Sequence, residues 1–135
     1  RDLHYPLRRQ RQMCIRDSCK MLGLRFDLCD PFLLSFSFDK CHLNFSSFYK
    51  LKLKSTRFSN CSLEQVDFSE VDLQKAIFDT CDFSGAVFSN TNLEAADLRT
   101  SHSFSIDPEE NKIFKALFSR DNLEGLLQKY RLQIS

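Results

Sequence analysis

The sequence predicts a repeat solenoid, and two periodicities carry that prediction. The first is a five-residue repeat, in which Phe or Leu recurs at every fifth position from Phe38 to Leu98. The second is an agreement at twenty residues, where like residues follow like. A helix would repeat its apolar residues at about 3.6 positions and a strand at two, so neither element explains the pattern. A fixed repeat over this length is typical of solenoids.

Residues twenty apart form four columns of similar side chains. They are Leu53, Leu73 and Leu93; Phe48, Phe68 and Phe88; Phe38, Phe58 and Phe78, continued by Leu98; and Cys41, Cys61 and Cys81, continued by Ser101. Coils stacked at β spacing, about 4.8 Å, place each member over the next. A five-residue repeat does not by itself require this agreement. The columns therefore predict four-sided coils with these residues as core ladders.

Three segments resemble pentapeptide repeats: CDFSG at 81–85, VDFSE at 66–70 and ADLRT at 96–100. The resemblance implies an all-β fold, a right-handed quadrilateral β-helix with one pentapeptide on each side and four in each coil. On this interpretation the β-helix covers residues 19–119, and its regular repeats cover 36–100.

Two stretches interrupt the predicted β-helix. Phe26 and Phe38 are twelve residues apart, two more than two repeats, so we expect a phase slip with a bulge or short loop over 27–35. Residues 101–111 are irregular, and Asp107 followed by Pro108 predicts one short helical turn. Ile113 then restores the original phase.

Residues 120–135 predict a C-terminal cap made of a helix and a short strand. The helix carries one apolar stripe, and Leu132 and Ile134 alternate as in a strand. The stripe consists of Leu123, Leu126, Leu127 and Tyr130. Such a helix covers the open end of a solenoid. The resemblance also implies a dimer contact, so a homodimer through this helix is the alternative.

Residues 1–18 stand apart from the repeat. Residues 13–18 resemble a translated sequencing adapter, which predicts a non-native segment; a disordered native tail is the alternative. The segment has five Arg and two Asp, so removing its charge of +3 from the total of +1 leaves −2 for residues 19–135. A strongly basic nucleic-acid binder is therefore not expected. Without a signal peptide or an apolar run that spans a bilayer, the sequence predicts a cytoplasmic protein with reduced thiols.

The sequence predicts no enzyme, no cofactor and no metal site. His42 and His102 fall on one face but three coils apart, roughly 14 Å at β spacing, so they cannot share a ligand. No nucleophile elbow, zinc-protease motif or phosphate-binding loop is present. Three cysteine thiols in a line cannot surround a zinc ion tetrahedrally.

The C-terminal part, from Thr91 to Ser135, is similar to small bacterial pentapeptide proteins related to the quinolone-resistance group. That resemblance implies binding to DNA gyrase or topoisomerase IV through an acidic rod that imitates DNA. Eight outward acids form the candidate interaction surface: Glu64, Asp67, Glu70, Asp72, Asp79, Asp82, Glu94 and Asp97. With Lys75 they give residues 58–98 a net charge of −7. The preceding coil is basic, with Lys40, Lys50, Lys52, Lys54 and Arg57.

Two explanations of the acidity remain. It contributes to a binding surface, or it follows from the fold, because Asp and Asn beside a large inward residue bond nearby backbone at the corners. The leading prediction is a non-enzymatic scaffold that binds an unidentified protein or acts as a spacer, without direct binding to nucleic acid or membrane. The alternative is a DNA mimic that modulates or protects gyrase or topoisomerase IV.

Overall fold

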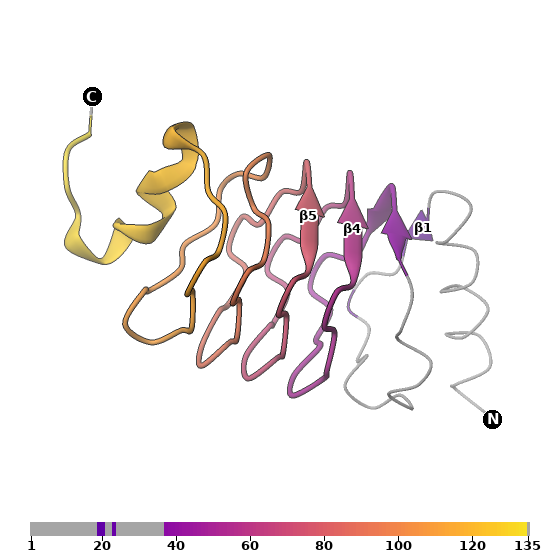
Figure 1. Cartoon of the computed structure of the whole chain (residues 1–135). Coiled ribbons are helices and arrows are strands. Elements are labelled where there is room, and N and C mark those ends of the chain that lie inside the picture. Colours follow the sequence, from indigo (N-terminus) through magenta and orange to yellow (C-terminus); the bar gives the residue numbers. More distant parts are fainter. Residues whose placement is uncertain (1–18, 21–22, 24–36, 135) are drawn as a thin grey trace.

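The computed structural model describes residues 19–20, 23 and 37–134. In this part of the chain, short segments wind into coils that stack side by side, and a helical segment follows the last coil (Figure 1). The strands are β1 (Cys19–Lys20), β2 (Phe38–Asp39), β3 (Cys41–His42), β4 (Arg57–Ser59) and β5 (Ile77–Asp79); the 3₁₀ helices are η3 (Arg120–Leu126) and η4 (Gln128–Tyr130). The strands are short because the chain turns a corner every five residues.

The coils stack in parallel register at an interval of twenty residues. β2, β4 and β5 form a parallel sheet in which Phe38 pairs with Phe58 and Phe58 with Phe78. The other three sides pair through single β-bridges at the same interval, as Lys52 does with Asp72. The backbone therefore adopts the β-helix of twenty-residue coils that the sequence predicts.

A residue in the left-handed conformation marks each corner. From Lys50 to Ala95, φ is positive at every fifth residue, and only Gly85 among these is a glycine. At most corners a hydrogen bond closes the turn, as from the N–H of Val71 to the carbonyl of Phe68 (3.2 Å). Each non-glycine corner costs about 1 kcal/mol of backbone strain. Packing of the coils on one another must outweigh this strain.

The first described rung shows a longer interval. β1 pairs with β3 in the register Cys19 to Cys41, an offset of 22 residues, and the N–H of Gly23 bonds the carbonyl of Asn44 in the same shifted register. Two additional residues therefore lie between Gly23 and Cys41. The stretch 27–35, where the sequence predicts the slip, lies outside the described residues, as do residues 1–18.

The predicted columns lie in the core. Phe68 stacks between Phe48 and Phe88, with ring centroids 5.4 Å away on each side, and Phe58 stacks between Phe38 and Phe78 at 5.1 and 5.0 Å. The two aromatic columns meet edge to face. All six rings, the leucine column and the cysteine column are buried. Each coil thus adds an equivalent layer to a continuous apolar core.

Polar side chains replace turn hydrogen bonds at two corners near the C-terminal end. The Ser101 hydroxyl accepts from the N–H of Cys81 (3.1 Å) and donates to the carbonyl of Phe78 (2.6 Å). The Asn111 amide bridges the N–H of Thr91 (2.8 Å) and the carbonyl of Phe88 (3.2 Å) in the same way. Buried backbone groups need partners. These side chains supply them where the direct turn bond is lacking.

After residue 100 the chain departs from the repeat and then returns to it. Phe104 and Ile106 are buried against the end of the core. The carbonyl of Asp107 accepts from the N–H of Asn111 (3.2 Å), which gives the single turn that the sequence predicts. Ile113 and Phe118 then pack against the core in the original phase.

The C-terminal cap differs from the prediction in two respects. Its helices are 3₁₀, and only Leu126 of the predicted stripe packs against the core cluster, while Leu123 and Tyr130 are exposed. The predicted final strand does not form over residues 131–134. Gly125 explains the cap: a Cβ there would meet the Phe104 ring at 2.3 Å, so this glycine brings η3 onto the core. The close approach of the Gly125 backbone to Phe104, and not the apolar stripe, therefore determines which side of η3 faces the core.

Asn122 fixes the cap to the last coil. Its amide donates to the carbonyls of Leu98 (2.8 Å) and Ser101 (2.9 Å), and its carbonyl accepts from the N–H of Ser119 (2.9 Å). Lys129 adds ion pairs with Asp107 and Glu109. Among the described residues, none of the helices has the length and apolar character needed to cross a membrane.

Candidate functional surface

The eight predicted acids all lie on the outside of the coils, but they are spread around the circumference. Glu64, Glu70, Asp79 and Glu94 lie at or beside corners, and the four remaining aspartates lie on four different sides. In the bridge columns, Asp67 lies between Ser47 and Val87, Asp72 between Lys52 and Asn92, Asp82 between Ser62 and His102, and Asp97 between Ile77 and Leu117. In these columns each aspartate has non-acidic neighbours on both sides, so they form no continuous acidic stripe.

The four aspartates on the sides of the coils share one structural role. In each, the carboxylate accepts a hydrogen bond from the backbone N–H two residues later, at 2.9 to 3.1 Å. These residues are Asp67, Asp72, Asp82 and Asp97. Asn92 makes the same bond to Glu94 at 3.1 Å without a charge. Turn formation therefore accounts for an Asp or Asn at this position, and it does not require the negative charge.

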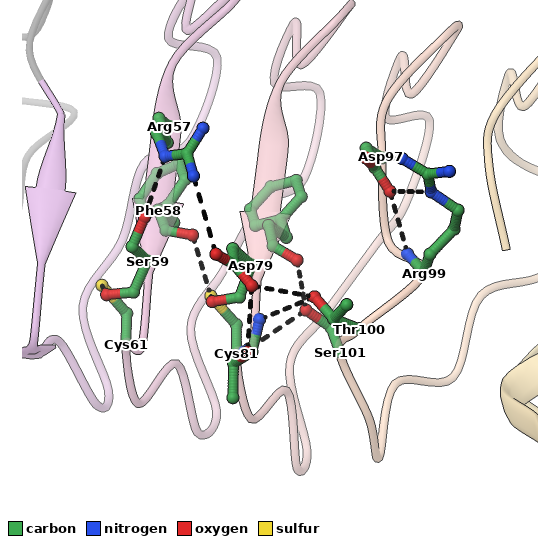
Figure 2. A network of polar contacts seen from close by, with 12 residues as sticks. Arg57, Phe58, Ser59, Cys61, Asp79, Cys81, Asp97, Arg99, Thr100 and Ser101 are labelled. Carbon is green, nitrogen blue, oxygen red and sulfur yellow. Dashed lines mark hydrogen bonds and ion pairs between the residues drawn. The ribbon is translucent and has the colours of Figure 1, made fainter. Parts of the chain in front are cut away.

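A polar network surrounds Asp79 on the side formed by β4 and β5 (Figure 2). Its carboxylate lies 3.6 Å from the Arg57 guanidinium and accepts from the hydroxyls of Thr80 (3.0 Å) and Thr100 (3.2 Å). Arg99 pairs with Asp97 at 2.9 Å. Both pairs are solvent-exposed, so each contributes little to stability.

The two ion pairs and Thr100 line a depression of about 290 Å³, with Ile77 among its lining residues. The side-chain hydrogen bond from Arg99 lowers the pKa of Asp97, against the opposing effect of burial. Asp97 is therefore a stable anion at neutral pH and a poor proton donor. The depression presents paired charges around an apolar side chain, which suits contact with a macromolecular surface.

The basic residues of the first regular coil lie at exposed positions. They are Lys40, Lys50, Lys52, Lys54 and Arg57. Lys52 stacks beside Asp72, so a positive and a negative side chain are neighbours in that column. The rod is thus polarised along its axis, from this basic coil to the acidic segment 58–98 that follows it.

The predicted histidine column is present, but it assembles no catalytic group. His42, Ser62, Asp82 and His102 follow one another on successive coils, which keeps the two histidines three coils apart. Among the described residues, no three His, Cys, Asp or Glu side chains are placed to hold a metal ion.

The cysteine column consists of the buried residues Cys41, Cys61 and Cys81. The hydrogen bond with Cys41 lowers the pKa of Cys61, but the bond with Cys81, burial and the charge of Cys81 together raise it to about 12. A protonated thiol is a weak nucleophile. Each of the last two thiols donates instead to a carbonyl of the preceding coil: Cys61 to Phe38 (3.5 Å) and Cys81 to Phe58 (3.3 Å).

Sequence reasoning missed two residue sets that matter here. The first is Cys19, which pairs with Cys41 in the register of β1. The twenty-residue interval did not predict this pairing, because the offset between the two residues is 22. Sequence reasoning also gave Asn122 and Gly125 no role, since their partners lie about twenty residues away in irregular segments.

Comparisons with known proteins bear on the fold. The family described as "Pentapeptide repeat region" matches residues 24–98. Among solved structures, the chain is similar to HetL, described as a pentapeptide repeat protein involved in heterocyst differentiation regulation in the cyanobacterium Nostoc sp. strain PCC 7120, with a TM-score of 0.54 and 14% identity over 75% of this chain. The chain spans 44% of the length of HetL. At this identity the likeness concerns the fold alone.

Two further similar structures have lower scores. QnrB1, described as a plasmid-mediated fluoroquinolone resistance protein, has a TM-score of 0.43 and 12% identity, covering 88% of this chain and 90% of that one. Rfr23 from the cyanobacterium Cyanothece 51142 has a TM-score of 0.34 and 18% identity, covering 88% and 95%. No sequence among the curated proteins matches this chain.

Proposed function

Because the chain belongs to the pentapeptide-repeat family, we propose that it is a non-enzymatic scaffold whose rigid outer faces bind another protein. The observation that carries this proposal is the difference between the inward and outward side chains of the coils. The inward positions of the regular coils are filled by buried side chains, while the outward positions form columns held by a hydrogen-bonded backbone. Such columns present side chains at fixed spacing, about 4.8 Å apart along the rod. Rigid presentation limits the entropy lost on binding.

The eight acids are the candidate interaction surface in this proposal. The chain offers a matched variant for testing them: Asp67, Asp72, Asp82 and Asp97 all replaced by Asn. Asn92 already makes the turn hydrogen bond from the same position, so this variant removes four charges while retaining the turns. We expect it to melt close to the natural chain. Substitution by Ala would remove the charges and the turn bonds together.

Affinity capture with the natural chain and the four-Asn variant tests the proposal. We expect a specific protein to be retained by the natural chain and to be lost from the variant. A partner retained equally by both would exclude these aspartates from the interface. If the folded natural chain retains no specific protein, binding fails as the function and a structural spacer remains.

The second candidate function is modulation of gyrase or topoisomerase IV by DNA mimicry, and the net charge of −7 over residues 58–98 favours it. The dispersed acids and the basic coil beside them favour the scaffold, since a duplex mimic presents phosphate-like charge continuously. A supercoiling assay with and without a fluoroquinolone separates the two. Rescue by the natural chain and not by the four-Asn variant would establish mimicry, whereas no effect from folded protein would exclude it.

Further parts of the proposal concern location, winding and self-association. The free thiols at Cys61 and Cys81 support a reducing compartment such as a bacterial cytoplasm. We infer right-handed winding, the usual hand of connections between parallel strands. A homodimer through the C-terminal helix would rely on the exposed Leu123 and Tyr130, because Leu126 packs on the chain's own core.

A further inference from the structure

In the part of the chain that the structure describes, the last coil has backbone hydrogen-bonding groups without partners. In the coil before it, the N–H of Leu93 donates to the carbonyl of Lys112 (2.7 Å), and the N–H of Lys112 donates to the carbonyl of Thr91 (3.0 Å). The corresponding groups one coil later are the N–H of Ile113 and the carbonyl of Asn111. Within the described residues neither has a hydrogen-bond partner. Residues 111–113 therefore form an open edge that matches the internal rungs.

The side chains at this edge are also uncovered. Leu53, Leu73 and Leu93 are at most 1% exposed, whereas Ile113 in the same column is only partly buried. Next to it, Phe114 is 69% exposed. Unpaired edges beside apolar side chains favour the addition of a further strand.

The cap covers a different part of the last coil. Asn122 bonds the carbonyls of Leu98 and Ser101, and the carbonyl of Gly125 accepts from the N–H of Ile106 (2.9 Å). These contacts hold η3 over residues 98–106. They leave the edge at residues 111–113 accessible.

Residues 132–134 have the apolar spacing of a segment that could cover this edge. Leu132 and Ile134 are 58% and 55% exposed, and they are two residues apart, as are the two inward positions of each repeat. The described backbone of residues 132–134 makes no hydrogen bonds. In its own copy this tail lies beyond η3 and η4 from the coils (Figure 1), and the ion pairs of Lys129 with Asp107 and Glu109 hold η4 there.

We propose that residues 132–134 of a second copy add to this edge as one further rung, and that two copies exchange tails reciprocally. Leu132 then covers Asn111 and Ile134 covers Ile113. The N–H of Gln133 donates to the carbonyl of Asn111, and its carbonyl accepts from the N–H of Ile113, as Lys112 does with Thr91 and Leu93. The Asn111 side chain already has hydrogen-bond partners, so its coverage leaves no amide group unsatisfied. This contact concerns self-association and does not depend on which macromolecule the outer faces bind.

Sedimentation velocity over a concentration series, with the whole chain, tests the exchange. We expect a monomer–dimer equilibrium that Leu132→Asp together with Ile134→Asp weakens by more than about tenfold, since the exchange buries both apolar side chains and a buried carboxylate lacks a partner there. Gln133→Asp is the control, because it adds a carboxylate to the side of the tail that faces away, and it matches the charge of each single variant, Leu132→Asp or Ile134→Asp. All three residues are exposed in the single copy, so the variants should retain the natural melting temperature.

Hydrogen exchange supplies the second measurement. We expect exchange of the Ile113 amide to slow as the protein concentration rises, and to lose this dependence in the double Asp variant. A monomer at all concentrations would overturn the proposal, and so would protection of Ile113 that does not vary with concentration, which would assign the edge to the chain's own tail. A dimer that survives the double Asp substitution would place the contact on η3 or between two edges.

Discussion

Replacement of Phe68 by Ala tests whether the aromatic columns hold the coils together. Phe68 is fully buried and lies at the centre of the aromatic core. It stacks on Phe48 and Phe88 at 5.4 Å and meets Phe58 and Phe78 edge to face at 6.4 and 6.2 Å. Truncating a buried Phe costs about 3 to 5 kcal/mol. We expect a loss near the upper end of that range.

The geometry of the coils gives the reason. The N–H of Phe48 bonds the carbonyl of Asp67 (2.9 Å), and the N–H of Phe68 bonds the carbonyl of Val87 (2.9 Å), so hydrogen bonds fix the spacing of the rungs. The neighbouring rings therefore cannot move together to fill the space that Ala leaves. Phe68→Asp would be worse, since it also buries a carboxylate without a partner.

Urea denaturation followed by far-UV circular dichroism gives the free energy of unfolding. Phe45→Ala is the control, because Phe45 is 61% exposed and its truncation should change the free energy by less than about 0.5 kcal/mol. Equal stability of the two variants would refute the layered core. A repeat protein can lose cooperativity when a central unit is weakened. Coincident transitions by dichroism and tyrosine fluorescence are therefore needed before the two values are compared.

The remaining predictions concern the cap, the corners and the thiols. Gly125→Ala should lower the free energy of unfolding by more than about 2 kcal/mol and shift the melting temperature, because the new Cβ overlaps the Phe104 ring. Asp72→Ala should cost about 1 kcal/mol in urea denaturation while Asp72→Asn leaves stability unchanged, since only Ala removes the turn acceptor. Lys75→Val should destabilise by about 1 to 2 kcal/mol and Lys75→Gly should be near neutral, because φ is 59° there. With its pKa raised to about 12, Cys61 should resist alkylation at pH 8 until urea unfolds the chain, as mass spectrometry can measure.

The regular core could be predicted because every coil repeats the same environment. Phe58 and Phe78 meet the same neighbours twenty residues before and after, so one column in the sequence describes many contacts in the structure. The interval also places each outward residue on a side of the rod. The twenty-residue interval therefore predicts that four aspartates lie on different sides of the rod, namely Asp67, Asp72, Asp82 and Asp97. The net charge of the segment does not contain this information.

The strained corners could not be predicted. Left-handed residues are normally signalled by Gly or Asn, but Lys50, Glu70 and Lys75 adopt this conformation here. Their local preference opposes the turn, and the stacking of neighbouring coils imposes it. The residue types indicate the local backbone preference, but they do not indicate the packing of neighbouring coils that overcomes it.

The cap was predicted only as a helix and a short strand, without its contacts, because these contacts are not periodic. The contact of Gly125 with Phe104 and the bonds of Asn122 to Leu98 and Ser101 join segments that have no repeat relation. The apolar spacing of Leu123 and Tyr130 suggested a buried stripe, but the approach of Gly125 determines which side of η3 faces the core. A single close contact therefore outweighs a four-residue pattern.

The outward positions of the pentapeptide differ in how tightly the fold constrains them. The residue before the large inward side chain supplies the turn acceptor, as Asp72 does, and the second residue after it must accept a positive φ, as Lys75 does. The residue directly after the large inward side chain, Gln74 in this repeat, needs neither a turn acceptor nor a positive φ. Its N–H already donates to the Asp72 carboxylate. Glu64, Asp79 and Glu94 occupy this third kind of position. The turn requires an acceptor at Asp72, though not its charge, and it requires neither an acceptor nor a charge at these three positions. Of the acids in the candidate surface, these three are therefore the least constrained by folding and the most open to selection by a proposed binding partner.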